Sequence, residues 1–195
     1  MMRIFIGTLG SVLMILVFSS CDRQLDRQKY ISKIMCYESG LHRKAIVGDF
    51  YFDILYTPAA YMVLKREDRQ LTRDQVVQMA GEIEGLQYYQ FEIGMKDGDS
   101  DIVSRLADGK KEKEQLLHYF SFGLQDDIYL EVARKRLPCK LFHFERSFDL
   151  KNSRRFLLGF DADSISDQCK FVIDSPVFND RLIEVVIDKR NIPEL

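Results

Sequence analysis

Polar and hydrophobic residues alternate through several parts of this chain, and a period of two is typical of β-strands with one buried face. The alternation is clearest in residues 49–56, where one side of the predicted strand carries Phe50, Phe52 and Ile54. Other short runs rich in aromatic or β-branched residues are bounded by turn formers and predict further strands. These runs lie at residues 61–65, 89–95, 118–122, 128–132, 141–145, 156–160, 170–173 and 182–187.

In one stretch the hydrophobic residues recur at the spacing of a helix instead. Its hydrophobic face comprises Val76, Met79, Ala80 and Ile83. Thr72 and Gln75 have the spacing of a capping box, in which each side chain satisfies a free backbone N–H at the start of a helix. The pattern therefore predicts one main helix near residues 73–85, followed after the next strand by a polar loop at residues 96–113.

Many short strands with one clear helix are typical of the α+β class. We expect a β-rich antiparallel domain, sandwich-like in architecture, with the helix on one face or at one end.

The first 20 residues follow a different pattern. Arg3 precedes an uncharged, mostly aliphatic run of 15 residues, Ile4 to Phe18, and the small residues Ser19 and Ser20 follow. A charged start, an apolar middle and small residues before a cleavage point are the features of a secretory signal peptide. The run is shorter than the roughly 20 residues of a membrane-spanning helix. We therefore expect residues 1–20 to be a signal peptide.

Residues 18–21 resemble the lipobox of bacterial lipoproteins, in which a signal peptidase cuts before a cysteine that receives diacylglycerol. Ser19, Ser20 and Cys21 match the motif, whereas Phe18 stands where Leu is usual. The resemblance implies lipidation of Cys21 with diacylglycerol and a fatty acyl group such as palmitate, and no other cofactor is expected. Cleavage elsewhere would leave Cys21 an ordinary thiol, and an uncleaved segment would remain as a membrane anchor.

This interpretation divides the chain into three parts. Residues 1–20 are the signal peptide, residues 21–35 the acylated cysteine and a polar tether, and residues 36–195 a single globular domain. The protein is then expected in the cell envelope, anchored by lipid to the inner or the outer membrane.

Charge and cysteine content narrow the picture further. The 28 basic and 30 acidic residues give a formal net charge of −2, so the basic excess of a nucleic-acid-binding protein is absent. Without Cys21, the domain keeps Cys36, Cys139 and Cys169. In an oxidising compartment, one disulfide and one free thiol are the simplest expectation, and the pairing is open. Cys139 lies in an apolar run and is expected to be buried.

His143 and Glu145 are the first candidates for chemistry. Residues two apart on a strand share a face, so an imidazole and a carboxylate could share a proton or a metal ion there. His118, in another predicted strand, could add a ligand. The alternative is a surface histidine hydrogen-bonded to its acidic neighbour.

Asp97, Asp99, Asp101 and Asp108 have the spacing of oxygen ligands in a calcium loop. Ile102 stands where such a loop needs glycine, and an acidic, solvated loop is the alternative.

The functional expectation is a non-enzymatic envelope lipoprotein, a binding or assembly component with an envelope protein or a glycan as partner. The alternative is a lipid-anchored hydrolase, or a metal-dependent binder, using His143, Glu145 and His118. The run from Pro138 to Glu145 resembles uncharacterised envelope lipoproteins, and that resemblance implies no activity.

Overall fold

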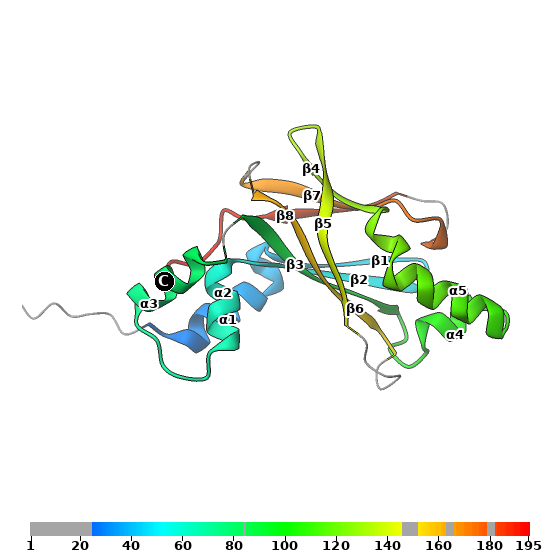
Figure 1. Cartoon of the computed structure of the whole chain (residues 1–195), viewed down its shortest axis with the longest axis horizontal. Coiled ribbons are helices and arrows are strands. Elements are labelled where there is room, and N and C mark those ends of the chain that lie inside the picture. Colours follow the sequence, from blue (N-terminus) through cyan, green and yellow to red (C-terminus); the bar gives the residue numbers. More distant parts are fainter. Residues whose placement is uncertain (1–24, 84, 146–151, 163–165, 179–181) are drawn as a thin grey trace, which may run out of the picture.

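The structure of the chain, a computed structural model, describes residues 25–83, 85–145, 152–162, 166–178 and 182–195 (Figure 1). The predicted signal peptide, the lipobox and Cys21 lie outside the described residues. Within the described part of the chain, no helix is both long and apolar enough to span a membrane.

The strands of the described residues form one antiparallel sheet of eight, in the order β1-β2-β3-β6-β5-β4-β7-β8. They are β1 (His42–Val47), β2 (Phe50–Thr57), β3 (Leu86–Met95), β4 (Ile128–Val132), β5 (Lys135–Glu145), β6 (Arg154–Asp161), β7 (Gln168–Ile173) and β8 (Ile183–Asp188).

Helices cover the two ends of this sheet. In Figure 1, α1 to α3 gather at one end and α4 and α5 at the other. The α-helices are α1 (Arg27–Met35), α2 (Ala59–Arg66), α3 (Arg73–Gly81), α4 (Ile102–Leu106) and α5 (Lys110–Ser121). Short 3₁₀ helices are η1 (Tyr37–Ser39), η2 (Gly123–Gln125) and η4 (Pro176–Phe178).

The sheet curls almost into a barrel. The pairing of β5 with β6 shifts register between Cys139 and Leu141, and an irregularity of this kind bends a strand. The first part of β5, Lys135 to Pro138, pairs with β4, and the part from Cys139 onward pairs with β6. The two ends of the curled sheet approach each other, since the Asp188 N–H at the end of β8 donates to the Gly40 carbonyl before β1, at 3.0 Å.

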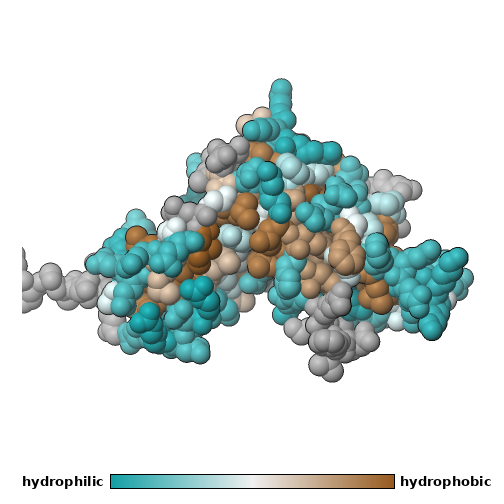
Figure 2. All heavy atoms as spheres, in the orientation of Figure 1, coloured by the Kyte–Doolittle hydropathy of each residue, from teal (hydrophilic) through white to brown (hydrophobic). Residues whose placement is uncertain are grey.

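Aromatic side chains fill the inside of the curl. Phe91 packs against Phe156 and Phe171, with ring centroids 5.7 and 5.2 Å apart, and all three are buried. Truncating one such ring to Ala typically costs about 3–5 kcal/mol. Figure 2 shows hydrophobic residues gathered across the middle of the viewed face, with hydrophilic residues at both ends.

A second core lies between the first three helices and the outside of β2. Leu55 projects from the sheet into a cluster with the fully buried Ile34, Val63 and Val76. The helix α1 thus belongs to the folded domain, although the sequence assigned residues 21–35 to a tether. Its buried Tyr30 and Ile34, four residues apart, lie on one helical face.

Several sequence predictions are confirmed. The antiparallel, mixed α and β class is correct, as are the strands predicted at residues 49–56, 89–95, 128–132, 141–145, 156–160, 170–173 and 182–187. The capping box is present: Gln75 N–H donates to Thr72 Oγ1 at 3.3 Å, and Thr72 N–H to Gln75 Oε1 at 3.0 Å. The helix ends at Gly81, short of the predicted residue 85.

The strands predicted at residues 61–65 and 118–122 are wrong, because both runs lie largely in helices, α2 and the end of α5. A short apolar run suits a buried helix turn as well as a strand. In α2 the helix starts directly after Pro58, and in α5 the preceding run of Lys, Glu and Gln favours helix. The polar loop predicted at residues 96–113 likewise contains α4 and the first turn of α5.

The sandwich-like architecture is also a wrong prediction. Alternation along the strands is the same for two stacked sheets as for one curled sheet, so it could not distinguish them. The domain also carries several helices in place of one main helix.

The expected disulfide does not form among the described cysteines. Cys36, Cys139 and Cys169 are all free thiols, and only Cys36 is exposed. Cys139 is buried as predicted, and burial raises the pKa of its thiol to about 11.

Candidate functional site

The β1–β2 hairpin brings a histidine and an aspartate together on the outer face of the sheet. Its register sets Lys44 opposite Asp53 and His42 opposite Leu55. Alternate residues project to the same face, so the side chain of His42 lies diagonally across from Asp53. His42 Nε2 is 2.6 Å from Asp53 Oδ1.

Both ring nitrogens of His42 face hydrogen-bond acceptors, since Nδ1 lies 2.7 Å from the Met35 carbonyl oxygen. A carbonyl oxygen and a carboxylate only accept, so the protonated ring, an imidazolium, can donate to both of them at once. Burial on its own lowers the pKa of His42, but the contacts with Asp53 and Met35 outweigh it and raise the pKa. Burial acts to raise the pKa of Asp53, and the hydrogen bonds from His42 and Tyr37 lower it overall.

Tyr37 completes this cluster. Its hydroxyl donates to Asp53 Oδ2 at 2.7 Å, and its ring stacks on His42 with centroids 4.0 Å apart. Burial and the contact with Asp53 raise the pKa of Tyr37 to about 12, so it remains a donor. The imidazolium, the carboxylate and the phenol therefore hold one another in place.

A second cluster lies beside the first, on β2, β3 and β6. The Tyr51 hydroxyl donates to Glu92 Oε1 at 2.6 Å, and Arg155 Nε donates to Glu92 Oε2. Lys44 Nζ stands 4.1 Å from the centroid of the Tyr51 ring. The Tyr51 ring covers Gly94 directly across the ladder, and a Cβ there would lie 2.5 Å from it.

His42 and Asp53 of the first cluster, together with Lys44, Tyr51, Glu92 and Arg155, line one groove of about 530 Å³ on the outside of the sheet. Strands β1, β2, β3, β5 and β6 supply most of its wall, and α2 closes one side with Tyr61 and Lys65. Glu145 and the exposed Gln90 also line it.

Two carboxylates of the groove have hydrogen-bond partners within the described part of the protein, whereas two of its lysines do not. Each oxygen of Asp53 and Glu92 accepts a hydrogen bond within the protein. In contrast, Lys65 has no hydrogen-bond or ion-pair partner among the described residues, and Lys44 contacts only the Tyr51 ring and the nearby charges. The groove therefore presents cationic donors to an occupant, while two of its carboxylates are already bonded.

The structure does not bring the predicted catalytic residues together. His143 and Glu145 are exposed on β5, and Glu145 alone of the pair lines the groove. His118 lies on α5, exposed, with its ring against Phe122. Across the described ranges, no three His, Cys, Asp or Glu side chains are arranged to hold a metal ion.

The predicted calcium-loop aspartates serve local structure. Asp97 accepts hydrogen bonds from the backbone N–H groups of Asp99 and Ser100. Asp101 caps α4 through the Ser104 N–H and forms an ion pair of 2.6 Å with Arg154. Asp108 precedes α5, where its backbone N–H donates to Glu112 Oε2 at 2.5 Å.

The pairing of His42 with Asp53 is not among the sequence predictions. One signal was available: Gly48 and Asp49 separate two runs of residues, as in a two-residue hairpin turn. Pairing Val47 with Phe50 across that turn gives the observed register and places both side chains on the same face.

No protein-family model matches the chain, and a search of curated proteins finds no match. Among solved structures, the chain is similar to a crystal structure described as a novel protein of unknown function from Burkholderia pseudomallei. The two chains are 13% identical with a TM-score of 0.39, and the similarity covers 85% of this chain and 86% of the other.

Proposed function

We propose that the protein is a lipid-anchored binding component of the bacterial cell envelope, whose groove receives an acidic segment of a partner protein. The anchor is Cys21, acylated after removal of residues 1–20. Support for the anchor comes from the charged, apolar and small-residue pattern of the first 21 residues.

One observation carries the binding role: the groove keeps Lys44 and Lys65 available while Asp53 and Glu92 are bonded within the protein. Arg155 adds a third cation: its Nε donates to Glu92, and its Nη groups donate no hydrogen bond within the described residues. Carboxylates of an incoming segment would find ammonium and guanidinium donors there.

The groove also lacks the arrangement that a hydrolase would need. In its protonated form His42 donates from both ring nitrogens and has no lone pair with which to accept a proton. The contacts with Asp53 and Met35 favour this form, because they raise the pKa of His42. The geometry therefore supports recognition better than acid–base chemistry.

Photocrosslinking in intact envelopes tests this function. A photoreactive amino acid at Gln90, inside the groove, should give an adduct with a partner protein. The same group at Lys135, exposed on β5 outside the groove, should not.

The double variant Lys44→Gln, Lys65→Gln should remove the Gln90 adduct while the protein level stays constant. Equal adducts at Gln90 and Lys135, or an adduct that survives the double variant, would contradict the proposal. An adduct with a glycan in place of a polypeptide would contradict a protein partner and identify the partner as a glycan.

A further inference from the structure

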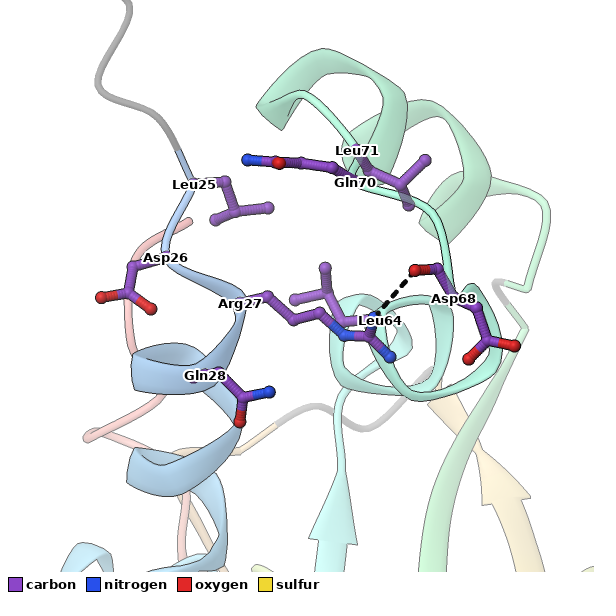
Figure 3. Close-up of a pocket in the computed structure, with 8 residues that line it drawn as sticks. All are labelled: Leu25, Asp26, Arg27, Gln28, Leu64, Asp68, Gln70 and Leu71. Atoms are coloured by element: carbon purple, nitrogen blue, oxygen red, sulfur yellow. Dashed lines mark hydrogen bonds between the residues drawn. The ribbon is translucent and has the colours of Figure 1, made fainter.

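A second pocket, of about 550 Å³, lies between the start of α1 and the connection from α2 to α3 (Figure 3). Leu25, Leu64 and Leu71 give it apolar surface, and Arg27, Gln28 and Gln70 give it hydrogen-bonding groups. It is separate from the groove described above, although α2 contributes to both.

The guanidinium of Arg27 makes few hydrogen bonds within the protein. Its Nε is buried without a hydrogen-bond partner, and its Nη1 reaches only the Asp68 carbonyl oxygen, at 3.5 Å. The carboxylate of Asp26 points away from the guanidinium, and Asp68 contacts it through its backbone carbonyl (Figure 3). Asp26 instead caps α1 by accepting from the Lys29 N–H. A buried guanidinium donor without a partner is costly, and an anion would satisfy it.

The pocket wall itself holds one basic residue, Arg27, and two acidic residues, Asp26 and Asp68, and an excess of basic residues lies in the segments that flank it. Residues 25–35 and 65–74 hold seven basic and four acidic residues, whereas the whole chain has a net charge of −2. The basic residues are Arg27, Lys29, Lys33, Lys65, Arg66, Arg69 and Arg73. Clustered basic residues beside a membrane are attracted to anionic lipid.

The pocket also begins close to the proposed anchor. Leu25 is four residues after Cys21, and four residues reach about 14 Å at most. An acylated Cys21 would therefore hold this end of the domain near the headgroups.

We infer that this pocket binds the phosphate of an anionic phospholipid headgroup, with Arg27 as the binding residue and the leucines against the glycerol region. The inference rests on the proposed lipid anchor. It also sets the orientation of the domain, because Leu64 in the pocket and Lys65 in the groove are adjacent on α2. A partner bound in the groove would then lie next to the bilayer.

The chain contains no tryptophan, so a Gln70→Trp substitution provides a single fluorescent reporter in the pocket. The full acylated protein is placed in nanodiscs of phosphatidylcholine with increasing phosphatidylglycerol. Tryptophan emission should shift to shorter wavelength, and acrylamide quenching should fall, as the anionic lipid increases.

Adding Arg27→Gln to the reporter protein should raise the phosphatidylglycerol fraction at half-maximal shift by about fivefold, the effect of one basic residue at an anionic surface. Arg27→Lys should keep most of the response, and Arg105→Gln, on α4 at the other end of the domain, should leave it unchanged. Equal melting temperatures show that the variants are folded.

A response that ignores lipid composition, or that is the same with Arg27→Gln, would overturn the headgroup site while leaving the anchor standing. Inorganic phosphate added to phosphatidylcholine discs should give little shift, and a full shift would assign the site to free phosphate. If mass measurement finds an unmodified Cys21, the anchor fails and the inference fails with it.

Discussion

The imidazolium of His42 donates to the Asp53 carboxylate across the β1–β2 hairpin, with Nε2 and Oδ1 2.6 Å apart. His42 is also tied to the carbonyl at the end of α1, and Asp53 to Tyr37 of η1. The pair thus joins the first helices to the wall of the groove.

This pair predicts how stability depends on pH. The pKa of His42 is raised by folding, so its contribution is complete below about pH 6.5 and is lost as pH rises through the folded pKa. The pKa of Asp53 is lowered, so its contribution is present above about pH 3.9 and is lost as pH falls through the folded pKa. The joint contribution is therefore largest between about pH 4 and 6.5.

His42→Gln should lower the free energy of unfolding by about 2 kcal/mol in that window, and by less above it. Urea denaturation across pH measures the difference between the two proteins. A penalty that grows with rising pH would contradict the imidazolium assignment.

Gly94→Ala should disturb the groove without changing any charge. The new Cβ would lie 2.5 Å from the Tyr51 ring, so the ring must move away from Glu92. We expect a loss of about 1–3 kcal/mol in stability, typical of overpacking, and a weaker Gln90 adduct. Gly81→Ala, in α3 with nothing near its added Cβ, is the matched control and should leave the adduct intact.

Lys189 should make the domain more stable as pH rises in the alkaline range. Its ammonium is buried against Gln87, with the Tyr56 ring centroid 4.7 Å away, and burial lowers its pKa. Between the folded pKa and about 10.4, the unfolded chain binds more protons, so stability rises with pH. Lys189→Met should remove this rise from the difference between variant and wild-type stability curves. An unchanged slope would show that Lys189 titrates normally.

The hairpin between β4 and β5 stores backbone strain. Ala133 and Arg134, its two turn residues, have φ of 48° and 67°, the left-handed region that suits glycine. Arg134→Gly should therefore stabilise the domain by about 1 kcal/mol in urea denaturation. Arg134→Ala removes the same side chain but keeps the strain. If it stabilises equally, the gain comes from the arginine side chain.

The alternation of hydrophobic and polar residues predicted most strands, because each strand buries one face. The start of α3 was predicted because Thr72 and Gln75 form a capping box, which marks the beginning of a helix. It failed at α2 and α5, where tertiary packing decides between two structures that a short apolar run allows. Tyr61 and Phe120 are buried in either case, so hydrophobicity alone does not reveal the period.

The candidate groove was harder to predict than the fold. Glu92 and Arg155 are 63 residues apart in the sequence, and they pair only because β6 lies beside β3 in the sheet. His143 was predicted as a candidate because an acidic residue is close to it in sequence, whereas the partner of His42 lies across a turn.

The most direct test of the whole account is the intact mass of the protein extracted from bacterial membranes. The account predicts a chain that begins at Cys21 and carries diacylglycerol with an added fatty acyl group. A soluble protein with a free thiol at Cys21, or a chain that retains residues 1–20, would contradict it.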